Sequence, residues 1–146
     1  LSRIRRAGPS DLSQLLTLGE EFAEVDPHTF EAGRAAGALL PLLEDDRYGE
    51  VWVVEDHTGL LGYAVLVWGY SVESGGRDAL LDEIYMREPG TGDGSRLLER
   101  VVSSARDRKI PVIFLETEPG NEAARRFYLR HGFVVEDSIW MTLDLD

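Results

Sequence analysis

The feature that most constrains this chain is a run of three glycines at every second position. Residues 85–101 read YMREPGTGDGSRLLERV, and Gly90, Gly92 and Gly94 separate a strand-like pattern from a helix-like one. Each glycine costs roughly 0.5–1 kcal/mol relative to alanine within regular structure, so the turn should have a use that offsets this cost. A turn without side chains at the positive end of a helix presents backbone N–H groups that favour an anion. The run therefore predicts a phosphate-binding turn, with a flexible surface turn as the alternative.

Two familiar phosphate-binding patterns do not fit this turn. An ATP-binding loop ends in Gly-Lys-Ser or Gly-Lys-Thr, whereas this chain has Gly94, Ser95 and Arg96. The dinucleotide fingerprint needs glycine at its sixth position, which is Ser95 when counted from Gly90. That fingerprint also usually opens the first strand–helix unit, whereas this run follows several predicted antiparallel strands. Neither ligand is therefore assigned.

The period of the apolar residues predicts an α/β domain of mixed, α+β-like type. A short strand at 3–5 precedes a helix that begins at Leu12, with Ser10 or Asp11 as its cap. The same patterns predict, in chain order, a helix at 29–46, strands at 51–55, 60–70 and 79–87, a helix at 97–109, a strand at 112–117, a helix at 122–131, and strands at 133–135 and 139–145. Antiparallel strands followed by a strand–helix–strand crossover predict a mixed sheet with helices on its faces.

Composition is that of an ordinary globular protein. The 146 residues, 43 % of them hydrophobic, predict one domain over 1–146 with a sizeable core. The chain has no cysteine, which excludes disulfides, thiolate zinc sites and a cysteine nucleophile. The three histidines have no metal-ligand spacing, so no metal is expected. No stretch approaches the roughly 18 apolar residues of a membrane span, and no signal-peptide pattern is visible, so we expect a cytoplasmic protein without a membrane partner.

The net charge of −12 bears on the partners of the protein. Nucleic-acid binding requires clustered lysine and arginine, so a nucleic-acid partner is disfavoured. An acidic protein attracts cationic ligands such as amines, although the same charge also serves solubility alone. The charge therefore leaves both a substrate-steering role and a purely solubilising role open.

The stretch NEAARRFYLRHGF at 121–133 makes a family resemblance specific. A strand with DEIYM, a glycine-rich turn, a helix with LLE, a further strand and then N-x-x-A-x-x-x-Y-x-x-x-G-F resemble the GNAT superfamily of N-acetyltransferases. The resemblance covers nearly the whole chain in element order and is strongest from Leu80 to Phe133. It implies the GNAT fold, a central mixed, mostly antiparallel sheet of about six to seven strands, with a splayed parallel pair in the middle and about four flanking helices.

The resemblance also implies a co-substrate, acetyl-CoA, and transfer of its acetyl group to a primary amine of a small molecule or peptide. Backbone N–H groups of residues 90–96 would hold the pyrophosphate, and Arg87 or Arg96 would supply a cation. The pantetheine arm would run between the strands at 79–87 and 112–117, with a hydrogen bond from Asn121. A main-chain N–H of Tyr85 or Met86, freed by a bulge, would polarise the thioester carbonyl. The cofactor-binding residues expected are Tyr85, Met86, Arg87, Gly90, Gly92, Gly94, Ser95, Arg96 and Asn121.

The turn departs from the family pattern at three points. Pro89 stands where the family usually has glutamine or arginine, and the connection from the strand is about two residues shorter. Asp93 occupies a position that is commonly apolar, where its charge would repel a pyrophosphate. These departures favour an alternative, a noncatalytic GNAT-like domain that binds an acyl-CoA or a protein partner.

The catalytic residues expected from the resemblance are Glu83 as general base and Tyr128 as general acid. Strand alternation places Leu81, Glu83 and Tyr85 on one face, although a solvent-facing or ion-paired glutamate is an equally weighted reading. Tyr128 matches the family tyrosine that protonates the leaving thiolate, and the alternative is a packed core tyrosine.

Other acids complete the set of candidates around the acceptor. Asp82 and Glu116 are the reserves for the base, and Glu73 is a candidate contact for a cationic substrate. The acceptor amine is not identified by any motif. Dimers are common among similar proteins, so a homodimer is also an expectation of the resemblance.

Overall fold

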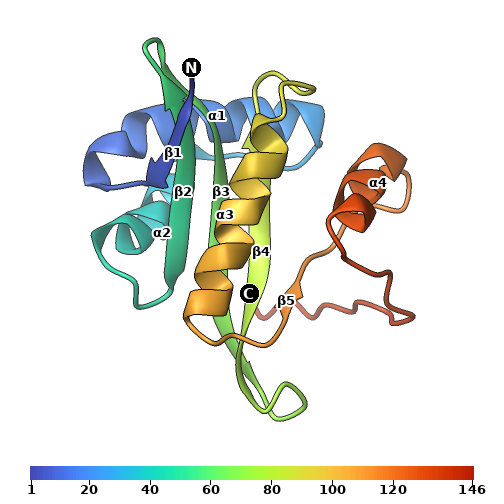
Figure 1. Cartoon of the computed structure of the whole chain (residues 1–146). Helices are drawn as coiled ribbons and strands as arrows, with labels where there is room; N and C mark the ends of the chain where they lie inside the picture. The colour runs from blue at the N-terminus through green and yellow to red at the C-terminus, as the bar shows by residue number, and fades with distance from the viewer. The chain divides into compact units, whose positions relative to one another are not determined.

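The computed structural model describes all 146 residues, which divide into two compact units, Leu1–Leu115 and Glu116–Asp146. The expectation of a single domain over 1–146 stays a prediction. The first unit holds one five-stranded sheet in the order β1-β2-β3-β4-β5, and the first four strands pair antiparallel (Figure 1). No helix of the chain is both long enough and apolar enough to cross a bilayer.

The elements follow the predicted order. They are β1 (Arg3–Arg6), a 3-10 turn (Pro9–Asp11), α1 (Leu12–Val25), α2 (Ala32–Glu44), β2 (Gly49–Asp56), β3 (Gly59–Ser71), β4 (Gly76–Met86), α3 (Asp93–Asp107), β5 (Ile113–Phe114) and, in the second unit, α4 (Glu122–Arg130). The helix over 29–46 forms in spite of its glycines and Pro41, because Glu31 caps α2 by accepting the N–H groups of Gly33 and Arg34.

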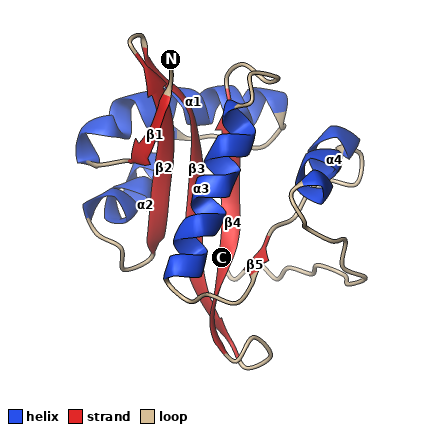
Figure 2. Ribbon diagram, viewed as in Figure 1, coloured by secondary structure: helices blue, strands red, loops and turns tan.

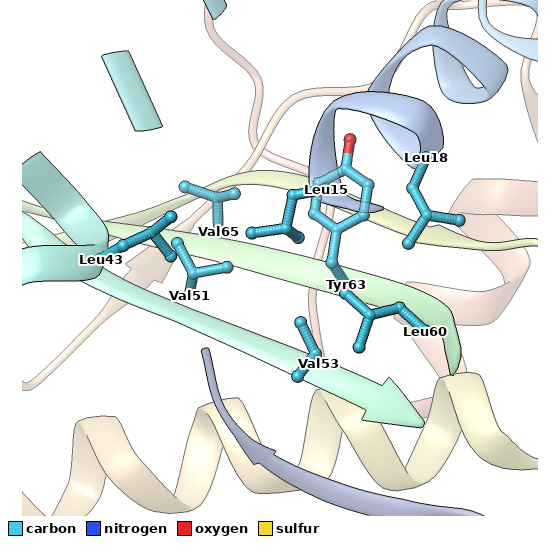
Figure 3. Packing of buried hydrophobic residues seen from close by; sticks show 8 residues of the cluster. All are labelled: Leu15, Leu18, Leu43, Val51, Val53, Leu60, Tyr63 and Val65. Atoms are coloured by element: carbon cyan, nitrogen blue, oxygen red, sulfur yellow. The ribbon is translucent and has the colours of Figure 1, made fainter. Parts of the chain in front are cut away.

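Helices cover both faces of the sheet in the first unit. α3 lies on one face, and α1 and α2 lie on the other (Figures 1 and 2). Side chains of α1, α2, β2 and β3 form the core on the α1 and α2 side (Figure 3): Leu15, Leu18, Leu43, Val51, Val53, Leu60, Tyr63 and Val65. The α3 stripe is buried as its spacing predicted, at Leu97, Leu98, Val101 and Ala105.

The expected parallel pair is present but lies at the edge of the sheet. β4 pairs with β5 only at Ala79↔Ile113 and Leu80↔Phe114. Beyond these pairs β4 continues to Met86 without a strand partner on that side, because β5 ends at Phe114, and the splay of the pair stays a prediction. The placement of this pair in the middle of the sheet was wrong.

The predicted strands over 133–135 and 139–145 are absent, so the sheet has five strands instead of six to seven (Figure 2). The strand predicted over 112–117 is likewise reduced to β5, at Ile113–Phe114. Alternating apolar residues indicate an amphipathic extended segment, but a strand also requires a neighbour that completes its backbone hydrogen bonds. No such pairing involves residues 133–146.

A buried carboxylate joins β1, β2 and α3. Glu50 of β2 is only 1 % exposed. Its oxygens accept hydrogen bonds from Trp52 Nε1 at 3.1 Å, Ser104 Oγ at 2.7 Å and Arg108 Nε at 2.9 Å. Arg6 of β1 completes the set at 3.3 Å. Both oxygens of this buried carboxylate therefore have hydrogen-bond donors, from β1, from β2 itself and from α3 and the residue that follows it.

Asp11 was one of two residues expected to cap the first helix, but its side chain bonds Arg5 and Gly8 instead. Its carboxylate accepts two hydrogen bonds from Arg5, at 2.8 and 2.9 Å, and one from the Gly8 N–H at 2.8 Å. It makes no side-chain cap of α1. The hydrogen bonds from Arg5 hold the pKa of Asp11 below its usual range. The residue therefore ties the start of α1 to β1.

Candidate active site

A cavity of about 420 Å³ lies between α1, α2 and the facing surface of β3 and β4. Pockets that hold small ligands have volumes of this order. Its polar lining comes from His28, Glu31, Arg34, Tyr63, Asp82 and Glu83. Its apolar lining comes mainly from Leu15, Phe30, Ala38, Leu39, Leu42 and Val65. All of these residues belong to the first unit.

A β-bulge at Asp82 brings two adjacent carboxylates into this cavity. β3 pairs Val65 with Glu83 but the next residue, Leu66, with Leu81, so Asp82 is the extra residue. An extra residue shifts the alternation by one, and Asp82 and Glu83 both line the cavity. Leu81 pairs with Leu66 and therefore does not share the face of Glu83, contrary to the simple alternation expected.

Glu83 is held by a short hydrogen bond from a buried tyrosine. Tyr63, which is 2 % exposed, donates from its hydroxyl to Glu83 Oε1 at 2.6 Å. Burial raises the pKa of Glu83, the hydrogen bond from Tyr63 lowers it, and the charge of Asp82 raises it further. Burial also raises the pKa of Tyr63, which keeps its phenol protonated as the donor. Glu83 makes no ion pair, so the ion-paired reading of this residue is wrong.

Asp82 is the weaker candidate for a base. Desolvation of the carboxyl group raises the pKa of Asp82, yet the residue as a whole is exposed, whereas Glu83 is partly buried. Solvent screens the charge of an exposed carboxylate. Glu83 is therefore the carboxylate that the structure sets up most clearly to accept a proton.

The glycine turn opens α3 with a bare backbone. Gly90 and Gly92 have φ of 84° and 87°, in the left-handed region that favours glycine. Gly92 is the N-cap of α3 and supplies no side-chain cap, and Gly94 and Ser95 lie in the first turn. A Cβ built on Gly90 or Gly92 meets no atom within 4 Å, so the space beside the turn is open. The Asp93 N–H donates to Thr91 Oγ1 at 3.3 Å, but Gly92 itself supplies no side-chain acceptor. A helix start with a glycine N-cap and open space beside it fits an anionic group such as a diphosphate.

Both cations expected beside the turn already have carboxylate partners. Arg87 donates to the two oxygens of Glu21, at 2.9 and 2.7 Å. Arg96 donates to Asp93 Oδ1 at 2.6 Å, and the same oxygen accepts from Ser2 at 2.8 Å. The charge of Asp93 is thus balanced within the protein, and a cofactor contact of either arginine stays a prediction.

Tyr85 and Met86 pair regularly with β3, opposite Tyr63 and Gly62. The bulge expected at these residues lies instead at Asp82. Neither residue has a strand partner on its other side, because β5 ends its pairing at Phe114. The Tyr85 hydroxyl donates to Glu21 Oε1 at 3.3 Å. A backbone contact of these residues with an acyl group remains a prediction.

The remaining predicted residues lie in other places. Asn121 Oδ1 accepts the Ala124 N–H at 3.1 Å and so caps α4, and its contact with the cofactor stays a prediction. Tyr128 lies on α4 with its ring 5.3 Å from Phe127 and 5.6 Å from Phe133, and its acid role stays a prediction. Glu116 also belongs to the second unit. Glu73 is exposed in the loop between β3 and β4 and does not line the cavity.

The sequence analysis assigned no catalytic role to His28, Glu31, Arg34 or Tyr63. Tyr63 could have been found only from the β3–β4 register, since the bulge decides which residue of β4 it meets. Residues 28–34 lie in and beside a helix whose glycines weakened its prediction. No motif marks them.

The sequence profile of the acetyltransferase (GNAT) family matches residues 14–133, which is most of the chain. The chain therefore belongs to the GNAT family of acetyltransferases, as the resemblance of its sequence implied. No curated protein matches the chain in a sequence comparison.

Solved structures confirm the GNAT fold. An integron cassette protein from the mobile metagenome of Cole Harbour salt marsh is 26 % identical, with a TM-score of 0.86 over 98 % of this chain and 90 % of that one. A possible acetyltransferase from Clostridium difficile 630 is 18 % identical, with a TM-score of 0.88 over 100 % and 99 %. A predicted acetyltransferase from Clostridium acetobutylicum, solved with acetyl-CoA, is 21 % identical, with a TM-score of 0.78 over 99 % and 97 %.

Proposed function

We propose that the protein is an N-acetyltransferase that moves the acetyl group of acetyl-CoA to a primary amine of a small molecule or peptide. The observation that carries the proposal is Glu83, partly buried and bonded to Tyr63, in a cavity beside the strand that leads to the glycine turn. A carboxylate with a raised pKa is suited to take a proton from an ammonium group. Family membership supports the acetyl donor.

The residues around the turn fit the donor. The backbone of residues 90–96 would hold its diphosphate, since the N-cap Gly92 supplies no side chain to the start of α3. The unpaired side of β4, from Leu81 to Met86, offers backbone groups for the amides of the pantetheine arm. When bound, acetyl-CoA supplies an acetyl thioester as the electrophile.

Two protons must leave the acceptor nitrogen during transfer. Glu83 takes the first and converts the ammonium to a nucleophilic amine. A new C–N bond forms as the C–S bond breaks, and the second proton leaves the nitrogen as the amide forms. Tyr128 would donate a proton to the departing thiolate and regain one from solvent. The sum consumes one ammonium and one thioester, and yields an amide, a thiol and one proton.

Binding and turnover of the purified chain test this proposal. Acetyl-CoA at 100 times its Kd should stabilise the fold by about 2.7 kcal/mol, which thermal unfolding detects. A panel of primary amines should then release free thiol in step with amide formation. A thermal shift without thiol release would favour the noncatalytic acyl-CoA-binding domain. The absence of any shift at millimolar acetyl-CoA would count against both functions.

The replacement Gly92→Val should weaken acetyl-CoA binding by about 10-fold or more. A β-branched residue is strained at a φ of 87°, and its side chain would fill the open space beside the turn. Gly75→Val is a matched control, because Gly75 has a φ of 80°, equally open surroundings and a place in the β3–β4 loop. Both variants should lose some stability, but only Gly92→Val should raise the Kd measured by calorimetry. Equal Kd values for acetyl-CoA in the two variants would show that the glycine turn does not bind acetyl-CoA.

The replacement Tyr128→Phe should lower kcat by about 10²-fold, at the low end of general acid catalysis, with little change in the KM for acetyl-CoA. Phenylalanine keeps the ring contacts with Phe127 and Phe133 but cannot donate a proton. Tyr70→Phe is the control, since Tyr70 is 80 % exposed on β3. Steady-state kinetics that show the same kcat in both variants would exclude Tyr128 as the acid.

A further inference from the structure

Arg34 of α2 lines the cavity with a guanidinium that has no partner. Its side chain makes no hydrogen bond, ion pair or ring contact, whereas its backbone N–H donates to Glu31 Oε2 at 2.6 Å. Arg5, Arg87 and Arg96, by contrast, each hold a carboxylate at 2.6–2.8 Å. Arg34 is an exposed residue, so the lining of the cavity includes one solvent-accessible guanidinium whose donors bond no other group of the chain.

The carboxylates of the cavity do not engage this guanidinium. Glu31 uses its two oxygens to cap α2, accepting the N–H groups of Gly33 at 3.0 Å and Arg34 at 2.6 Å. Only its charge acts on the Arg34 side chain. Glu83 accepts a hydrogen bond from Tyr63, and neither Glu83 nor Asp82, both on β4, forms an ion pair with Arg34. The donors of Arg34 are thus left for a group that enters the cavity, and a planar fork of N–H donors matches a carboxylate.

The rest of the lining is mostly apolar and comes from α1, α2 and β3. It includes Leu15 and Phe30, the α2 residues Ala35, Ala38, Leu39 and Leu42, and Val65. α2 supplies Arg34, and the bulge of β4 supplies Asp82 and Glu83. A single ligand in this cavity would meet a cation on α2, carboxylates on β4 and an apolar wall.

We propose that the acceptor is a primary amine on an apolar framework that also carries a carboxylate, that is, an apolar amino acid. Its ammonium group lies at Asp82 and Glu83, its carboxylate lies at Arg34, and its hydrocarbon part packs on the apolar lining. This assignment rests on the proposed function and narrows its substrate. A diamine is the competing acceptor, because its second ammonium would meet the guanidinium of Arg34 but also the carboxylate of Glu31 in the same lining.

Matched acceptors with and without the carboxylate test the assignment. Leucine is compared with isopentylamine, ε-aminocaproate with pentylamine, and cadaverine serves as the diamine. Thiol release should show kcat/KM about 10–100-fold higher for the acceptor that carries the carboxylate, the value of a charge-assisted hydrogen-bonded pair. Leucine and ε-aminocaproate distinguish an α-amino acid from an ω-amino acid. Equal kcat/KM within each pair, or a preference for cadaverine, would overturn the proposal.

The variant Arg34→Gln should reduce the preference within each pair to about one. Arg47→Gln is the control, because Arg47 is exposed in the loop between α2 and β2 and does not line the cavity. The control should keep the preference of the wild type. A preference that survives in Arg34→Gln would overturn the proposal even if the wild type favours amino acids.

A binding measurement separates this inference from the proposed reaction. Calorimetry of leucine and ε-aminocaproate without acetyl-CoA reports the cavity alone. Binding to the wild type that is lost in Arg34→Gln supports the carboxylate site, even where no acceptor releases thiol and the proposed reaction fails. Failure of both ligands to bind the wild type, together with turnover of simple amines, would overturn the amino-acid assignment and leave the acetyltransferase intact.

Discussion

Replacement of Glu83 by glutamine is expected to lower kcat for acetyl transfer about 10²–10⁴-fold, the range for loss of a positioned general base. Glutamine has nearly the same shape and can still accept the Tyr63 hydrogen bond, but it cannot take a proton from the acceptor. The KM for acetyl-CoA should change little, because the glycine turn is intact. Steady-state kinetics with the preferred acceptor make this measurement.

The pH profile identifies the role of Glu83 more directly than the rate. Because burial raises its pKa above the ordinary value of 4.5, kcat should rise with pH as Glu83 loses its proton, with a midpoint above 4.5. That limb should disappear in Glu83→Gln. Glu73→Gln, at an exposed loop acid, should keep both the rate and the limb. A Glu83→Gln enzyme with an unchanged rate and profile would exclude Glu83 as the base.

Replacement of Glu50 by alanine is expected to cost about 3 kcal/mol of the free energy of unfolding, at the lower end for a broken buried ion pair. The change removes the acceptor shared by Trp52, Ser104 and Arg108. Arg6 and Arg108 keep 34 % and 28 % of their side-chain surface exposed, so water offsets part of their loss. Urea denaturation followed by tryptophan fluorescence measures the effect.

Two further variants serve as comparisons for the Glu50→Ala result. Glu50→Gln keeps an acceptor for Trp52 and Ser104 but loses the charge facing the arginines, so its loss should be intermediate. Glu99→Ala, at an exposed position of α3, should change stability by no more than about 0.5 kcal/mol. If Glu50→Ala denatures at the same urea concentration as Glu99→Ala, the Glu50 network does not stabilise the unit.

Most of the fold followed from local pattern. The helical stripe from Leu97 to Ala105 and the β2–β3 hairpin were predicted because burial of one face imposes a period that the residues themselves display. The strands at 133–135 and 139–145 were predicted on the same ground and are absent. Alternation of apolar residues predicts which side chains can share a face of a strand, but it does not predict whether a neighbouring strand exists to pair with it.

The candidate site was predictable only in part. Glu83 and the glycine turn were found because each is marked within a short stretch of chain. The sequence analysis predicted a bulge at Tyr85 or Met86, whereas the structure has it at Asp82. Nothing in the local sequence distinguishes the residue of β4 that β3 leaves unpaired. Arg34 carries no motif, and its importance comes from the absence of a partner, which depends on every residue around it.

Residue order alone was enough to place a flexible glycine turn before α3, an acid on β4 and a chain of GNAT type, because these properties depend on neighbours within a few residues or on a family pattern. The meeting of Tyr63 with Glu83, and of α2 with the bulge across one cavity, required the folded chain. Those contacts join residues 20 or more positions apart, and their geometry is set by sheet register and helix packing, which no local pattern encodes.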